Sequence, residues 1–180
     1  MKRFLLLIAA VLLSSTAIAD EFGSTISTFR QASQTAPFFE GAYGYAVFPS
    51  VGKGGIGLGG AYGQGQVYRG GSAVGKSKLV QVTFGFQLGG QAFSQIVFLQ
   101  DKRAYDEFTS GSFEFGAQAS AVAITLGASA QAGTTGTGAQ AGDNQAKANY
   151  VSGYAIFTSA KGGLMYEATI GGQTFTFDPY

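Results

Sequence analysis

The sequence contains no cysteine, no histidine and no tryptophan among its 180 residues. Without histidine or cysteine, Ser–His and Cys–His nucleophile pairs are excluded, and so are the usual zinc, copper and iron ligand sets. The absence of cysteine also means that the fold needs no disulfide, and the absence of tryptophan removes the strongest aromatic anchor type. We therefore expect a protein that is not an enzyme and that holds neither a metal nor another cofactor.

Charged residues are also scarce, at 12% of the chain. When Lys2 and Arg3 are set aside, 11 − 2 = 9 basic and 10 acidic residues remain, which gives a net charge of −1. Such a near-neutral balance does not steer a protein toward nucleic acid or an anionic membrane, so any contact of that kind must come from local clusters. We expect no nucleic-acid partner.

Residues 1–19 have the pattern of a signal peptide. Lys2 and Arg3 precede an apolar run from Phe4 to Leu13, and Ala17-Ile18-Ala19 fits the small-x-small cleavage rule. The apolar run is too short to cross a bilayer as a helix. The sequence therefore predicts an exported protein that starts at Asp20 and resides in the periplasm, at the outer membrane or in the medium.

Glycine and the aromatic residues are abundant, with 29 Gly, 16 Phe and 9 Tyr. This composition favours β-structure with tight turns and close backbone approaches. Residues 20–180 have the length of one domain. We expect a mainly β (α+β) fold, an antiparallel, barrel-like sheet with two short helices. The polar, low-complexity segment 133–147 reads as a flexible loop.

Two stretches have the character of helices. Between Asp20 and Pro37, apolar residues recur on one helical face, at Phe22, Ile26, Phe29, Ala32 and Ala36. Pro37 marks the end of this helix or a restart. The second helix covers 101–108, with Asp101 as its N-cap, Gly111 closing it, and Ala104, Tyr105 and Phe108 facing the core.

One segment is written twice. Residues 44–55 read GYAVFPSVGKGG and residues 153–163 read GYAIFTSAKGG, which lie 153 − 44 = 109 positions apart. An apolar run, a glycine pair and a second apolar run are typical of a β-hairpin, so we expect two similar hairpins with Lys53 and Lys161 at or near their turns. Further strands are expected at 79–88, 96–99, 113–132 and 173–177.

Two glycine motifs resemble nucleotide-binding loops. Residues 70–77 match GxxxxGK[ST], and residues 55–60 contain GxGxxG. Both motifs need a helix after the loop, but residues 78–88 alternate like a strand. Asp106 and Glu107 are adjacent, and neighbours on a helix point about 100° apart, so they form a poor acid/base pair. We expect no nucleotide partner and a solvated carboxylate face.

Basic residues gather in the sequence around the first repeat copy and the loop that follows it. They are Lys53, Arg69, Lys76 and Lys78, with Lys161 joining them through the second copy, and several tyrosines lie nearby. Basic side chains beside amphipathic aromatic rings suit phospholipid headgroups at a membrane interface. The alternative is that they are ordinary solvent-facing lysines on turns.

Several segments, in order, resemble the SYLF domain family. They are residues 42–55, 59–65, 84–91, 96–99 with 104–108, and 154–163. The resemblance implies a non-enzymatic lipid-binding domain, whose eukaryotic members bind phosphoinositides and actin-regulating partners, often through an amphipathic N-terminal helix. Here that helix carries a single base, Arg30, and so lacks a polybasic face. Actin contact is not expected of an exported bacterial member.

The leading hypothesis is a phospholipid-binding protein of the bacterial cell envelope that docks peripherally. The predicted lipid-binding residues are Phe22, Ile26, Phe29, Lys53, Arg69, Lys76, Lys78 and Lys161. Two alternatives stay open. Period-2 stretches and abundant aromatics would also fit a small integral outer-membrane β-barrel, and the Gly/Ala-rich segment 113–132 would fit a self-associating structural envelope protein.

Overall fold

The structure is a computed structural model, and it describes residues 21–115, 124–126 and 149–180. Three long strands dominate it: β1 (Gly44–Arg69), β2 (Ser72–Leu99) and β5 (Tyr154–Pro179). The short strands β3 (Ser112–Phe115) and β4 (Ile124–Leu126) both pair with β5. The predicted signal peptide, the predicted 133–147 loop and most of segment 113–132 lie outside the described residues.

The strands form a single sheet with the order β1-β2-β5-β3. All of these neighbours are antiparallel, and only β4 runs parallel to β5. The prediction of a mainly β, antiparallel, single-domain fold is therefore confirmed. Within the described residues the order does not close on itself, since β1 and β3 are its two ends.

Within the described residues, three helices accompany the sheet, one more than predicted. The N-terminal helix covers residues 21–31, and α2 (Ala36–Gly41) follows after a short break, with proline in its first turn. The proline thus restarts a helix, one of the two predicted outcomes, because its missing N–H costs nothing at that position. The third helix, α3 (Lys102–Phe108), has the predicted cap: the Asp101 carboxylate accepts from the Ala104 amide at 2.8 Å.

The two predicted hairpins at the repeated segment are wrong. Lys53 lies in the middle of β1, opposite Gln91, and residues 161–163 lie inside β5. The two copies instead flank the same stretch of β2, since Ala46 and Ile156 are both paired with Val97. Both copies run antiparallel to β2, so they run parallel to each other on its two sides.

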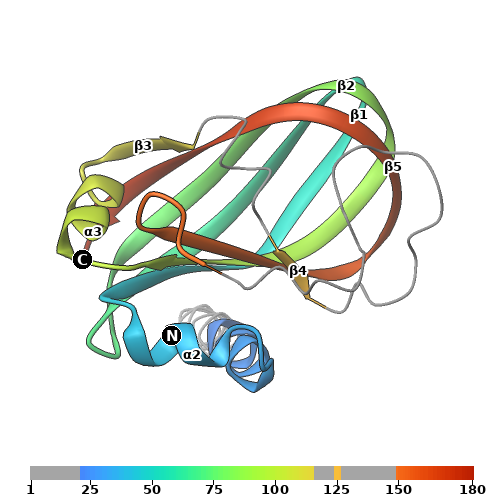
Figure 1. The fold of residues 1–180 in the computed structure, drawn as a ribbon. Helices are drawn as coiled ribbons and strands as arrows, with labels where there is room; N and C mark the ends of the chain where they lie inside the picture. Colours follow the sequence, from blue (N-terminus) through green and yellow to red (C-terminus); the bar gives the residue numbers. More distant parts are fainter. Residues whose placement is uncertain (1–20, 116–123, 127–148) are drawn as a thin grey trace, which may run out of the picture.

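The long strands bend sharply, and glycine makes the bend possible. A Cβ on Gly55 would lie 2.4 Å from the Cα of Gly59, so β1 turns within this short stretch. After the bend, Gly65 lies so close to Phe48 that an added Cβ would be 2.5 Å from its ring. The strand therefore packs against its own first half, and Figure 1 shows the long strands curving round and returning.

The bent sheet encloses one core and carries a second on its outer side. The inner core, inside the bend, contains Ala46, Phe48, Val51, Ala61, Val67, Leu79, Val97, Leu99, Ala104, Tyr105, Phe108, Phe115, Tyr154, Ile156 and Phe175. The helix-side core, beneath the N-terminal helix and α2, contains Phe22, Phe29, Phe38, Tyr45, Val47, Ile96, Phe98, Ala155 and Phe157. One end of the sheet is thus buried on both faces, while the outer face of the other end has no such cover among the described helices.

Candidate functional site

The outer face of β2 changes character along the strand. Ile96 and Phe98 point from this face into the helix-side core and are fully buried. Further along, side chains on the same face are exposed: Phe84 is 65% exposed and Val82 is 47% exposed. Alternation along a strand places these even-numbered residues on one side of the sheet. The apolar face that the helices cover at one end therefore continues uncovered at the other.

The neighbouring strand β1 extends this exposed surface. Leu58 lies opposite Phe84 and Tyr62 lies opposite Val80, and all four side chains are exposed. The apolar strip, as we name this surface, consists of Ile56, Leu58, Tyr62, Val80, Val82 and Phe84. Scattered exposed apolar residues are ordinary, but a contiguous group on one face marks an interaction surface.

Two lysines continue the strip along β2. Lys78 and Lys76 follow Val80 on the same face and are both exposed. The ammonium of Lys76 lies 5.9 Å from the centroid of the exposed Tyr180 ring. The nearest carboxylate in the register is Asp178, opposite Lys76 on β5. The result is an apolar surface with a cationic end.

The structure does not bring the five predicted basic residues together. Lys53 is half-buried in β1, and Arg69 lies with its guanidinium 5.4 Å from the Tyr105 ring, beside α3. Lys161 forms an ion pair with Glu21 of the N-terminal helix, at 3.2 Å. Lys76 and Lys78, two residues apart on β2, lie on its outer face. A spacing of two residues in a strand predicts that both side chains lie on one face, and this could have identified the pair. The other three basic residues are close in sequence or belong to the repeat, but the long strands carry them to different parts of the sheet.

The predicted apolar residues of the N-terminal helix face the protein. Phe29 is fully buried, Phe22 is 8% exposed, and Ile26 is partly buried against the same core. The helix was correctly predicted to be amphipathic, but its apolar face covers the sheet. Lipid contact by these three side chains would therefore require the helix to leave the sheet, and the predicted role stays a prediction.

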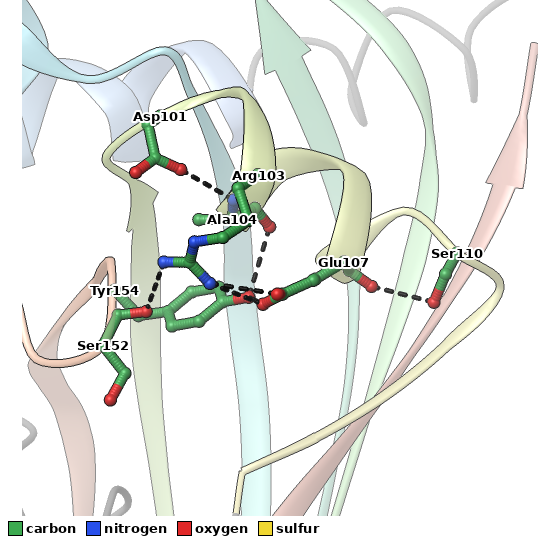
Figure 2. Close-up of polar contacts among 7 residues, drawn as sticks. All are labelled: Asp101, Arg103, Ala104, Glu107, Ser110, Ser152 and Tyr154. Atoms are coloured by element: carbon green, nitrogen blue, oxygen red, sulfur yellow. Dashed lines mark hydrogen bonds and ion pairs between the residues drawn. The ribbon is translucent and has the colours of Figure 1, made fainter.

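A polar cluster joins α3 to the start of β5 (Figure 2). The Tyr154 hydroxyl donates to Glu107 Oε2 at 2.8 Å, and Arg103 donates to the same carboxylate at 2.9 Å and to the Ser152 carbonyl at 3.0 Å. These partners, the tyrosine first, hold the pKa of Glu107 below its ordinary value. Burial and the neighbouring carboxylate raise the pKa of Tyr154.

This cluster has a structural explanation. Ser152 has a positive φ of 55°, and a Cβ on Gly153 would lie 2.5 Å from the Arg103 guanidinium, so the arginine braces a tight turn. The prediction of a solvated carboxylate face holds for both residues: Asp106 pairs with exposed Lys102, and Glu107 is also exposed, although it accepts from Tyr154 and Arg103. The donors and acceptors satisfy one another, and we assign the cluster to fixing α3 rather than to chemistry.

The remaining motifs have plain structural roles. The loop-like motif at 70–77 contains a turn at Gly70 and Gly71, after which β2 begins, as the strand prediction required. In the described part of the chain, no group of His, Cys, Asp and Glu side chains is arranged to hold a metal. None of the helices in this part is both long and apolar enough to cross a bilayer.

Comparison with known proteins places the chain in a family. A family model described as Ysc84, Las17-binding protein actin regulator, matches residues 80–179. That is 179 − 80 + 1 = 100 of 180 residues, and it includes most of β2, α3 and β5. The searches against curated proteins and against solved structures found no significant match. The match confirms the resemblance drawn from the sequence, and the chain belongs to the Ysc84 (SYLF) domain family.

Proposed function

We propose that the protein binds phospholipid bilayers peripherally, as a non-enzymatic component of the bacterial cell envelope. The observation that carries the proposal is the apolar strip next to Lys76 and Lys78. Apolar side chains gain free energy by leaving water, at about 25 cal/mol per Å². Lysines at the border of such a surface keep their charge in the headgroup layer while their stems pack on the apolar part. The family is of the lipid-binding type, which agrees with this reading.

The location and the absence of catalysis rest on the sequence. A signal peptide at residues 1–19 would send the chain to the envelope, away from cytosolic actin, so we do not extend the actin-regulating role in the family description to this chain. The chain has no histidine and no cysteine, and the Glu107 carboxylate is occupied by structural partners. These features support binding rather than chemistry.

Co-sedimentation with vesicles tests the proposal. The full chain and a chain of residues 20–180 are mixed with neutral or anionic phospholipid vesicles, at low and high salt. We expect residues 20–180 to sediment with the vesicles, and more strongly with anionic ones at low salt. Salt-insensitive binding would favour the N-terminal helix over the lysines. If residues 20–180 stay in the supernatant with every lipid mixture, the proposed function is wrong.

A further inference from the structure

We propose that the apolar strip is the lipid-contact surface of this protein, that Lys76 and Lys78 bind anionic headgroups, and that the N-terminal helix stays on the sheet. This inference rests on the proposed function and assigns its site and its lipid class. It assigns lipid contact to Leu58, Val82 and Phe84 in the strip, and not to the apolar face of the N-terminal helix.

The first argument compares the two ends of the outer face. At one end, the N-terminal helix and α2 bury apolar side chains of β2 and its neighbours, including Phe98 and Phe157. At the other end, the strip presents side chains of the same kind, with Ile56 80% exposed and Leu58 58% exposed. The helices remove the apolar side chains from water at the first end, and none of the described elements does so at the second end. A bilayer surface would do so there.

The second argument is charge. No aspartate or glutamate occurs between Glu40 and Asp101, so all the charged residues of β1 and β2 are basic. On the outer face, the described carboxylates nearest in register are Asp178 on β5 and Glu114 on β3, both on the side away from β1. Two lysines, Lys76 and Lys78, lie beside one directly opposite carboxylate, Asp178, so the surface that continues the strip has a net positive charge. This fits an anionic lipid headgroup, and it disfavours a neutral one.

The third argument fixes the orientation. β1 is an end strand of the pairing order, and the end strand of a sheet has no neighbouring strand on its outer edge. Placing such an edge in hydrocarbon would leave its backbone groups without hydrogen bonds, at a large cost. We therefore expect the sheet to lie face down, with its side chains about 5–10 Å into the headgroup–acyl boundary. Phe84 and Lys76 are 84 − 76 = 8 residues apart, about 27 Å along the strand, and both then touch the surface.

Matched substitutions test the site in the protein as recovered after export. Val82→Thr and Val151→Thr make the same change at 47% and 43% exposed positions, and only the first lies in the strip. We expect Val82→Thr to weaken vesicle binding about fivefold and Phe84→Thr more than tenfold, while Val151→Thr binds like wild type. Threonine keeps the strand propensity, and circular dichroism confirms that each variant is folded.

The charge arm uses variants with equal loss of net charge. K76Q/K78Q should weaken binding to anionic vesicles about 25-fold at low salt, since each lysine near the surface contributes about fivefold. R30Q/K102Q removes two exposed cations from the helices and should change binding little. Equal effects of the two pairs would show that only net charge matters, and would overturn the role of Lys76 and Lys78.

The depth arm exploits the lack of tryptophan. Phe84→Trp and Phe22→Trp each introduce a single tryptophan, whose emission can be excited apart from that of the tyrosines, one in the strip and one in the helix-side core. With lipids brominated at shallow or deep acyl positions, we expect Trp fluorescence of the first variant to be quenched best by shallow bromines, and that of the second to be unaffected. Quenching of the second variant alone would mean that the helix inserts and would overturn the inference.

The outcomes separate this inference from the proposed function. If wild type binds no vesicles, the proposed function fails, and the inference fails with it. If wild type binds but the strip variants bind equally well, only the inference fails. If the strip variants instead change the oligomeric state in light scattering without lipid, and leave vesicle binding intact, then the strip is a contact between copies of this chain.

Discussion

Tyr45 and Tyr154 occupy equivalent positions of the repeated segment, yet they lie on opposite faces of the sheet. Tyr45 is paired with Phe98, whose partner on β5 is Ala155 and not Tyr154. This offset of one residue inverts the side chains of residues 154–157 relative to those of residues 45–48. Tyr45 therefore stacks on Tyr68 on the helix side, with ring centroids 5.1 Å apart, while Tyr154 enters the inner core.

The first prediction concerns acid stability. Because Tyr154 and Arg103 lower the pKa of Glu107 from its ordinary 4.5, their interaction stabilises the fold above that pH and is lost as pH falls through the lowered pKa. We expect the free energy of unfolding of wild type to decline in this range, and that of Glu107→Gln to decline less steeply. Urea unfolding at a series of pH values from neutral to strongly acidic measures this.

The two tyrosines supply the control. Tyr154→Phe removes the hydroxyl that donates to Glu107, so its pH dependence should be shallower and it should lose about 1–2 kcal/mol at neutral pH. Tyr45→Phe should keep the wild-type pH dependence. An unchanged pH profile for both Glu107→Gln and Tyr154→Phe would mean that the cluster contributes nothing to acid stability.

The second prediction concerns the bend of β1. Gly65→Ala would place its Cβ 2.5 Å from the Phe48 ring and 2.6 Å from the Val47 carbonyl. A movement of the Phe48 ring would not relieve the clash with the Val47 carbonyl, which belongs to the backbone. We therefore expect the free energy of unfolding, measured by chemical denaturation, to fall by about 2–3 kcal/mol. Gly52→Ala in the same strand has no atom within 4 Å of its Cβ and should be close to neutral. Similar values for the two variants would contradict the close packing of β1 on itself.

The third prediction concerns a buried amide pair. Gln95 is fully buried and donates to Gln173 at 3.0 Å, and Gln173 donates back at 3.2 Å. Gln95→Leu leaves the Gln173 side chain with only its longer hydrogen bond to Gln81, at 3.5 Å, which should cost about 1–3 kcal/mol. Adding Gln173→Leu should restore part of this loss, because a pair of apolar side chains needs no partner. A double-mutant cycle in urea measures the coupling, and additive losses would contradict it.

The fourth prediction concerns the attachment of the N-terminal helix. Its ion pair between Glu21 and Lys161 joins partly exposed groups, and such pairs contribute about 0–1 kcal/mol. Phe29 is fully buried, so Phe29→Ala should cost about 3–5 kcal/mol. We expect hydrogen exchange of residues 21–31 to accelerate strongly in Phe29→Ala and barely in Lys161→Ala. Equal acceleration would mean that the ion pair holds the helix.

The local elements were the most predictable from the sequence. Asp101 as N-cap and Ala104, Tyr105 and Phe108 as core residues are all confirmed, because capping and helical periodicity depend on neighbouring residues. The spacing of Phe22 and Phe29 likewise predicted a helix. The spacing does not show what the apolar face of the helix covers, since a helix that packs on a sheet and a helix that lies on a membrane both need such a face.

The glycine pairs and the apolar strip were less predictable. Lys53-Gly54-Gly55 reads as a turn, but here glycine serves a bend and a close approach of two strand segments, which depend on residues far away in the sequence. Val80, Val82 and Phe84 alternate with Gln81 and Thr83, and this alternation shows which residues share a face but not which face is buried. Only the register with β1 and β5 shows which row is buried.

The central position of β2 has a consequence for folding kinetics. Its pairing with β1 starts locally, from Arg69 opposite Ser72, but its pairing with β5 joins Leu99 to Tyr154, 154 − 99 = 55 residues away. Non-local pairing is slow, because the chain must close a long loop before the contacts reward it. We expect the β1–β2 pair to form early, with one long edge of β2 left open. Until β5 pairs with β2, another chain can form hydrogen bonds with the open edge of β2. Pairing of residues 154–179 with β2 removes this opportunity for aggregation.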